Sequence, residues 1–305
     1  MKRLLVPLDR SVLAERALDV AAMLAARDGA TLRLVNVWPA ELRDAAAPRG
    51  GGTGALGDQG GTDRYLEKVA TELHARSAIP VETVLLEPPA APAICREARD
   101  ADVDLIVMST HGRTGWSRLW IGSVADSIVR TAETPVLLVR ARENGAEVTA
   151  RLERVLVPLD GSPKAERILP VLVKLCDGTT VHVRLLRVVQ PVRTLLVMPE
   201  GGIPVADVDE GATRDAVTHA EYDTARAAAK LRADLPHAEV ETSVLVHDAI
   251  ARTVVQAAQE VDLVAMVPRR HGAGRLLLGS VTDKVLRGTH ASLLVLHQEH
   301  GPVGA

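Results

Sequence analysis

The sequence predicts an α/β protein of two similar halves, each an open five-stranded parallel sheet with helices on both faces. In the first half, continuous apolar runs alternate with segments of helical periodicity, and the same pattern returns in the second half. Runs without apolar–polar alternation are typical of strands covered on both faces, and strand–helix alternation requires parallel strands joined by right-handed crossovers. The expected strands of the first half are residues 4–8, 32–37, 81–86, 103–108 and 136–139, and the expected helices are 12–27, 63–77, 90–100 and 123–132.

An internal repeat supports the division into halves. Matching segments are residues 3–11 with 154–162, 122–126 with 279–283, and 136–139 with 293–296. A chain of 305 residues exceeds what one hydrophobic core usually serves. We therefore expect domains at 1–140 and 151–298, joined by a linker at 141–150.

The last strand of each half also predicts how the halves associate. Val136–Val139 and the matching Leu293–Leu296 are apolar, and an unpaired edge strand exposes its amides and carbonyls. Pairing the two strands would satisfy both edges. We therefore expect an internal pseudo-dimer, with a homo-oligomer or a protein partner as further possible assemblies.

Composition favours a small-molecule ligand. Hydrophobic residues make up 47% of the chain and charged residues 25%, which is typical of a globular protein with a sizeable core. Aromatic residues total 2% and the net charge is -3. Few aromatic side chains are available to stack on bases, and a negative net charge does not attract a phosphate backbone. We therefore do not expect nucleic acid as a partner.

Cysteine usage and the apolar segments indicate the compartment. Cys95 and Cys176 have no Cys or His at metal-binding spacing, and we expect both to be buried thiols in a reducing environment. The apolar stretch at the N-terminus is too short for a signal peptide, and no segment reaches membrane-spanning length. We expect a cytoplasmic protein that binds no membrane.

The segment from Val107 to Ser123 has the layout of an anion site. It leaves an apolar run, passes through a glycine-bearing loop and ends where a helical pattern begins. Glycine allows backbone amides to approach a ligand, and a helix start adds unpaired N–H groups and the positive end of the dipole. Ligands of such sheets bind beyond the carboxyl ends of the strands, so we expect Asp9 and Ser109 to face one crevice.

A second glycine motif does not qualify. Gly52–Gly57 matches G-x-G-x-x-G, but it lies in the glycine-rich loop at 40–61. A dinucleotide fingerprint must leave a strand and open a helix directly, so we attribute this match to composition. At the matching place, the second half has a different insertion at 191–209, richer in Val, Leu and Pro.

The five-stranded pattern, Asp9 and the Ser109–Ser123 loop together resemble the universal stress protein family, here as a tandem pair over nearly the whole chain. In nucleotide-binding members the loop reads G-2x-G-9x-G-[ST]. This chain reads Ser109-2x-Gly112-9x-Gly122-Ser123, so the spacing is kept and only the first glycine is replaced. The resemblance implies a Rossmann-like fold of the adenine-nucleotide α hydrolase type.

The resemblance also implies a role for eight residues. The phosphates would be held by Gly112, Gly122, Ser123 and the amide of Val124, the ribose would lie by Met108 and Ser109, and adenine would meet the backbone of Val37 and the side chain of Asp9. Each role is chemically reasonable, because glycines allow close approach and hydroxyls, amides and carboxylates complement a nucleotide.

Purely structural roles are the alternative for the same residues. Asp9 and Asp160 each precede a helix and could cap it. Ser123 and Ser280 each precede an Asp by three residues, which resembles a capping box and would need no ligand.

The loop of the second half is degraded. Pro268 removes an amide donor, and Arg270 stands at the position of Gly112. Either this half has lost its nucleotide and serves as a dimer-like partner, which we favour, or Arg269, Arg270 and Arg275 build a different anion pocket.

We therefore expect a stress-linked regulatory protein that binds ATP or a related adenine nucleotide in its first half, alone or with Mg²⁺. The alternatives are a tandem module that works through protein contacts without nucleotide, and a weak ATPase. The chain has no P-loop, nucleophile-elbow or zincin motif and no evident general base, so we expect slow ATP hydrolysis at most.

Overall fold

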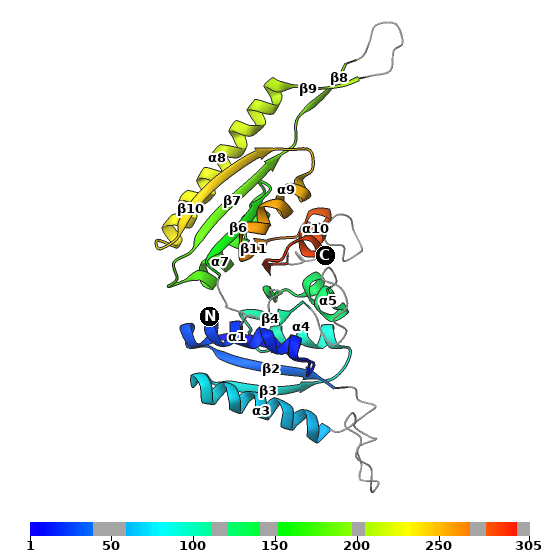
Figure 1. Ribbon diagram of the computed structural model, residues 1–305, viewed down its shortest axis with the longest axis vertical. Coiled ribbons are helices and arrows are strands. Elements are labelled where there is room, and N and C mark those ends of the chain that lie inside the picture. Colours follow the sequence, from blue (N-terminus) through cyan, green and yellow to red (C-terminus); the bar gives the residue numbers. More distant parts are fainter. Residues whose placement is uncertain (39–58, 111–120, 141–151, 197–204, 269–278, 298–305) are drawn as a thin grey trace, which may run out of the picture. The chain divides into compact units, whose positions relative to one another are not determined.

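A computed structural model describes residues 1–38, 59–110, 121–140, 152–196, 205–268 and 279–297 (Figure 1). The chain forms two compact units. Unit 1 comprises the described residues up to 140 together with 292–297, and unit 2 comprises 152–268 with 279–291. Among these residues, no helix is both long and apolar enough to cross a membrane.

Unit 1 contains the parallel sheet that the sequence predicts. Its strands are β1 (Arg3–Pro7), β2 (Thr31–Val37), β3 (Val81–Leu86), β4 (Leu105–Ser109) and β5 (Val136–Val139), in the order β5-β4-β1-β2-β3. Its helices are α1 (Val12–Asp28), α3 (Gln59–Ser77), α4 (Ala90–Asp100) and α5 (Ser123–Thr131). Every strand and helix predicted for this half is present, with ends that differ by a few residues.

The core of unit 1 is aliphatic, as expected for a chain without Phe. Leu4, Leu5 and Val6 in β1 are fully buried, and Leu105 to Met108 in β4 are buried at every position. Consecutive buried residues require cover on both faces of the sheet. This explains why these strands read as continuous apolar runs.

The last strand of the chain belongs to unit 1. β12 (Ser292–Val295) pairs antiparallel with β5, with Leu294 opposite Leu137. The backbone amide of Arg140, just past β5, also donates to Ser292 Oγ at 3.3 Å. The pairing predicted between the two final apolar runs is therefore present.

Unit 2 repeats the sheet order of unit 1. Its strands are β6 (Arg154–Leu159), β7 (His182–Val189), β10 (Glu239–Val246) and β11 (Leu263–Met266), in the order β10-β7-β6-β11. Its helices are α6 (Pro163–Glu166), α7 (Ile168–Cys176), α8 (Glu210–Asp234), α9 (Ile250–Ala257) and α10 (Ser280–Gly288), with a short 3₁₀ turn, η1 (Ala258–Glu260), after α9. In Figure 1, α8 covers one side of β7 and β10, while α9 and α10 lie on the other.

Two local features distinguish unit 2. The helix equivalent to α1 is divided into α6 and α7, because Pro170 has no amide to donate to the carbonyl of Glu166. The insertion at 191–209 contains an antiparallel pair, β8 (Arg193–Leu196) and β9 (Val205–Val208). The glycine-rich loop and the 141–150 linker of the first half lie outside the described residues, except that α3 already begins at Gln59.

Candidate functional site

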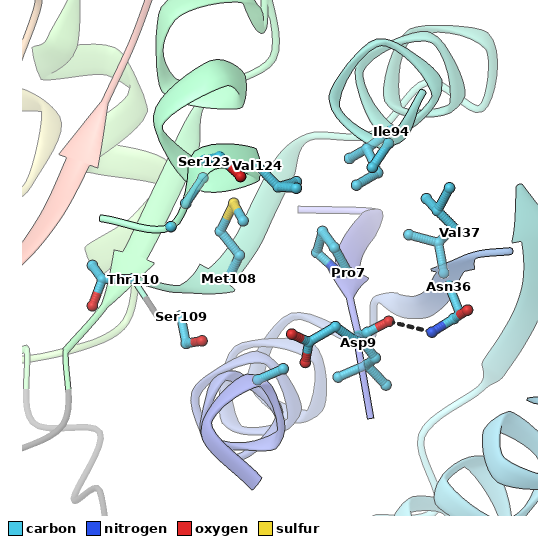
Figure 2. Close-up of a pocket in the computed structure, with 16 residues that line it drawn as sticks. Pro7, Asp9, Asn36, Val37, Ile94, Met108, Ser109, Thr110, Ser123 and Val124 are labelled. Carbon is cyan, nitrogen blue, oxygen red and sulfur yellow. Dashed lines mark hydrogen bonds between the residues drawn. The ribbon is translucent and has the colours of Figure 1, made fainter. Parts of the chain in front are cut away.

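A pocket of about 290 Å³ opens at the carboxyl ends of β1, β2 and β4 in unit 1 (Figure 2). The structure brings seven of the eight predicted residues into its lining: Asp9, Val37, Met108, Ser109, Gly122, Ser123 and Val124. Asp9 and Ser109 line the same pocket, as the parallel topology predicts. The eighth residue, Gly112, falls within 111–120, outside the described part of the chain.

Asp9 is oriented by the start of α1. Its Oδ1 accepts hydrogen bonds from the amide of Ser11 at 3.0 Å and from Ser11 Oγ at 2.5 Å. Ser11 Oγ in turn accepts from the amide of Ala14 at 3.0 Å, so Ser11 is the N-cap. The interpretation of Asp9 as a helix cap is therefore wrong, and the carboxylate instead fixes the capping serine.

The same correction applies in unit 2. Asp160 Oδ1 accepts from the amide of Ser162 at 2.8 Å and from Ser162 Oγ at 2.6 Å, and Ser162 Oγ caps α6 through the amide of Ala165 at 3.2 Å. In both halves, a serine caps the helix and an aspartate holds that serine from the pocket side. In Figure 2 the Asp9 carboxylate points toward the end of β4 that carries Ser109.

The floor of the pocket contains a residue that sequence reasoning missed. Asn36 is 6% exposed, and its Nδ2 donates to the carbonyl of Leu8 at 2.6 Å (Figure 2). This hydrogen bond ties the end of β2 to the β1–α1 loop that carries Asp9. A polar residue inside the apolar run 32–37 was the available signal, because buried amides usually serve a specific partner.

The opposite end of the pocket is the start of α5. Gly122 is its N-cap and has no side chain to satisfy the first-turn amides. The amide of Gly122 donates to Thr110 at 2.9 Å, and the helical ladder begins when Asp126 donates to Gly122 at 2.9 Å. The amides of Ser123 and Val124 therefore precede the ladder and present the positive end of the helix dipole at the pocket edge.

The capping-box interpretation of Ser123 is wrong. Ser123 is the first helical residue rather than the N-cap. Asp126, the expected partner in such a box, is instead paired with Arg130, whose Nε and Nη2 donate at 2.7 and 2.8 Å. In α10 the N-cap is likewise a glycine, Gly279, and Arg287 Nε lies 3.1 Å from Asp283.

A second contact anchors α1 beside the pocket. The Tyr65 hydroxyl in α3 donates to Glu15 Oε1 in the first turn of α1 at 2.8 Å. Burial and this carboxylate raise the pKa of Tyr65 well above its usual value, so the hydroxyl stays protonated further into the alkaline range than an exposed tyrosine does. The contact holds α3 against the end of α1 that follows Asp9.

Unit 2 has a pocket at the equivalent strand ends, with a volume of about 380 Å³. It is lined by Asp160, Arg187, Met266, Val267 and Ser280, among others. The arginines that sequence reasoning considered for this half lie in 269–278, outside the described residues. Pro268 is the residue of unit 2 equivalent to Thr110. The amide of Thr110 donates to the carbonyl of Val139 at 3.4 Å, whereas a proline has no amide hydrogen to donate.

Comparison with solved structures shows the same fold over almost the full chain. The protein PA1789 from Pseudomonas aeruginosa aligns with a TM-score of 0.64 at 15% identity, covering 97% of this chain and 92% of that one. A universal stress protein from Archaeoglobus fulgidus aligns with a TM-score of 0.61 at 18% identity, covering 97% and 98%.

Sequence comparison agrees with the fold. Universal stress protein Mb2028c of Mycobacterium bovis is 29% identical over 65% of this chain and 63% of its own length. Universal stress protein MJ0531 of Methanocaldococcus jannaschii is 40% identical over 20% of this chain and 36% of its own length. The matched regions thus span less than two thirds of these relatives. The model of the universal stress protein family matches residues 1–140 and again 151–297. This chain is therefore a tandem member of the universal stress protein family.

Proposed function

We propose that the pocket of unit 1 binds ATP or a related adenine nucleotide, and that the protein acts as a regulatory binding protein in a stress response. The observation that carries this proposal is the pairing of an oriented carboxylate, Asp9, with an amide-rich helix start, that of α5, across one pocket. These two groups complement the two ends of a nucleotide. One solved universal stress protein is a complex with cAMP, which is itself an adenine nucleotide.

The base would bind at the Asp9 end. Among the contacts of the described residues, Asp9 uses Oδ1 to hold Ser11, which leaves Oδ2 as an acceptor for the exocyclic amine of adenine. The backbone of Val37, at the end of β2, lies beside it in the lining. Because Asn36 ties β2 to the Asp9 loop, both recognition groups are held before the ligand arrives.

The ribose and phosphates would extend toward α5. Met108 and Ser109 lie at the end of β4, between Asp9 and the helix start, and we assign them to the ribose. Gly122, Ser123 and the amide of Val124 would receive the phosphates, together with Gly112. Mg²⁺ would accompany ATP through the phosphate oxygens, and the Ser123 hydroxyl is an oxygen donor at this end.

The test is whether the purified full chain binds or carries an adenine nucleotide. Denatured protein should release ATP or ADP that chromatography detects, and calorimetry on nucleotide-free protein should show one ATP per chain. Incubation with ATP should release ADP slowly at most. Protein that carries no nucleotide and shows no ATP binding heat would contradict the proposal and favour the module that acts through protein contacts alone.

A further inference from the structure

The pocket of unit 2 is built from the same parts as the pocket of unit 1. Equivalent residues line the two: Pro158, Asp160, Met266, Gly279 and Ser280 stand where Pro7, Asp9, Met108, Gly122 and Ser123 stand. The second pocket has a volume of about 380 Å³ against about 290 Å³ for the first. Unit 2 has therefore kept room for a ligand of at least the same size.

The polar residue on the floor differs between the pockets. Val35 in β2 pairs with Pro7, and Leu186 in β7 pairs with the equivalent Pro158. The next residues, Asn36 and Arg187, are therefore equivalent. Asn36 Nδ2 donates to the carbonyl of Leu8 at 2.6 Å, and Arg187 Nη1 donates to the equivalent carbonyl of Leu159 at 3.4 Å. The structural bond is thus preserved, while a neutral amide becomes a permanently charged guanidinium.

The neighbouring loop is adapted to this arginine. Gly161 follows Asp160 with φ +78°, and a Cβ there would lie 3.2 Å from Arg187 Nη2. The equivalent residue of unit 1 is Arg10, with φ 67°, whose guanidinium lies over Trp38 at 5.1 Å from the ring centroid. Unit 1 therefore carries its guanidinium on the loop, turned onto an aromatic ring, whereas unit 2 carries one on the pocket floor and has a glycine that makes room for it.

This exchange changes which base edge the pocket can recognise. Asp160 and Arg187 line the same pocket. A carboxylate accepts N–H groups, and a guanidinium donates through a planar fork. Guanine offers O6 and N7 as acceptors for a guanidinium and N1–H as a donor for a carboxylate, whereas adenine has an amino group in place of O6. The apolar lining from Ile250 and Val254 suits a planar base in either case.

The other end of the pocket suits a phosphate group, as in unit 1. α10 begins at Ser280 after the N-cap Gly279, and Asp283 donates its amide to the Gly279 carbonyl at 3.0 Å. The amides of Ser280 and Val281 therefore precede the helical ladder, and both residues line the pocket. A nucleotide would therefore place its phosphate at the start of α10 and a base with hydrogen-bond acceptors beside Arg187.

We propose that the pocket of unit 2 is a second nucleotide site that selects guanine over adenine through Arg187, so that one chain holds two different nucleotides. The proposal rests on the nucleotide-binding function proposed for unit 1. Of the two interpretations of the degraded loop, it favours the one in which the second half keeps a ligand site of its own. It assigns ligand recognition to Arg187 on the pocket floor rather than to Arg269, Arg270 and Arg275.

The test measures GTP and ATP binding to the full chain by calorimetry. In the presence of saturating ATP, one GTP should still bind per chain. Arg187→Asn copies the floor residue of unit 1 and should weaken GTP binding by about tenfold to a hundredfold, since one good two-donor contact to guanine contributes about 1–3 kcal/mol. ITP keeps O6 and N7 and should bind much as GTP does.

Matched variants separate recognition from folding. Arg226→Asn removes an exposed arginine of the same unit, which pairs with Glu166 outside the pocket, and should leave GTP binding unchanged. Arg187→Lys keeps the charge without the fork and should give intermediate affinity. Circular dichroism and thermal melting of each variant verify the fold, and Arg187→Lys serves as the test if Arg187→Asn does not fold.

Each outcome decides between the two proposals. If ATP binds but GTP does not, if ATP displaces GTP, or if folded Arg187 variants bind GTP as the wild type does, the second site is overturned and the adenine site of unit 1 stands. If neither nucleotide binds, both proposals fall. If GTP binding depends on Arg187 while ATP binding does not, both are supported.

Discussion

The two pockets of this chain share a framework and differ in the polar residue on the floor. In each, an aspartate holds the serine that caps the first helix, and a glycine N-cap leaves the amides of a later helix facing the pocket. On the floor, Asn36 of unit 1 and Arg187 of unit 2 stand at equivalent positions. In both units, the loop after the first strand is held by the serine cap and by a side-chain hydrogen bond to a main-chain carbonyl. Because an amide or a guanidinium can donate that bond, the floor residue can differ in charge while the loop keeps its conformation.

The largest expected effect is on stability, from a substitution in β12. Leu294 is fully buried in β12, so Leu294→Ala should destabilise by about 2–5 kcal/mol through lost burial and a residual cavity. All three tryptophans, Trp38, Trp116 and Trp120, belong to the first half of the sequence. Because β12 pairs with β5, this substitution in the second half should lower the unfolding transition seen by tryptophan fluorescence.

Leu172→Ala provides the matched control for that experiment. Leu172 is also fully buried, but it lies in α7 of unit 2. Its effect should be larger by circular dichroism than by tryptophan fluorescence. A tryptophan transition that Leu294→Ala leaves unchanged, while circular dichroism shows destabilisation, would show that β12 does not stabilise unit 1.

The loop after β4 gives the next largest effect. Gly112→Arg copies the residue that the second half carries at the same spacing, and it adds a side chain where phosphates would approach the backbone. ATP affinity should fall by about a hundredfold, equivalent to about 2.8 kcal/mol, with the fold retained. Calorimetry measures the affinity, and ATP binding close to the wild-type value in a natively folded variant would remove this loop from the phosphate site.

Two serines offer a matched pair with a moderate effect. Ser11→Ala and Ser162→Ala each remove an N-cap hydrogen bond, so each should lower the free energy of unfolding by about 1 kcal/mol. Only Ser11→Ala should also weaken ATP binding, because Ser11 orients Asp9. Chemical denaturation and ATP calorimetry measure the two effects, and an equal loss of ATP affinity in both variants would contradict the assignment of adenine to unit 1.

Ser123→Ala should have the smallest effect. Gly122 is the N-cap of α5, so removing the Ser123 hydroxyl should change the free energy of unfolding by less than about 0.5 kcal/mol. ATP affinity should fall by about fivefold, corresponding to the loss of one hydrogen bond of about 1 kcal/mol. A stability loss as large as that of Ser11→Ala would restore the capping role to this serine.

The sequence by itself determined the architecture and the location of the site. Continuous apolar runs predicted β1 to β5, because strands covered on both faces need apolar residues at every position. The repeat predicted the same sheet order twice, and the matching final runs predicted the β5–β12 pairing. Since parallel strands bring their carboxyl ends to one edge, Asp9 and Ser109 could be assigned to one pocket across a hundred residues of sequence.

Only the tertiary structure decided which hydrogen-bond partner each polar side chain has at the helix starts. Asp9, Asp126 and Ser123 each fitted a local capping pattern, yet the caps are Ser11 and Gly122, and Asp126 pairs with Arg130 instead. A short polar side chain has several partners within reach along the chain, and the choice depends on distances that folding sets. The repeat aligns Asn36 with Arg187, because the two residues follow Asp9 and Asp160 at the same spacing. Only the structure shows that both side chains donate to the carbonyl of the residue before that aspartate.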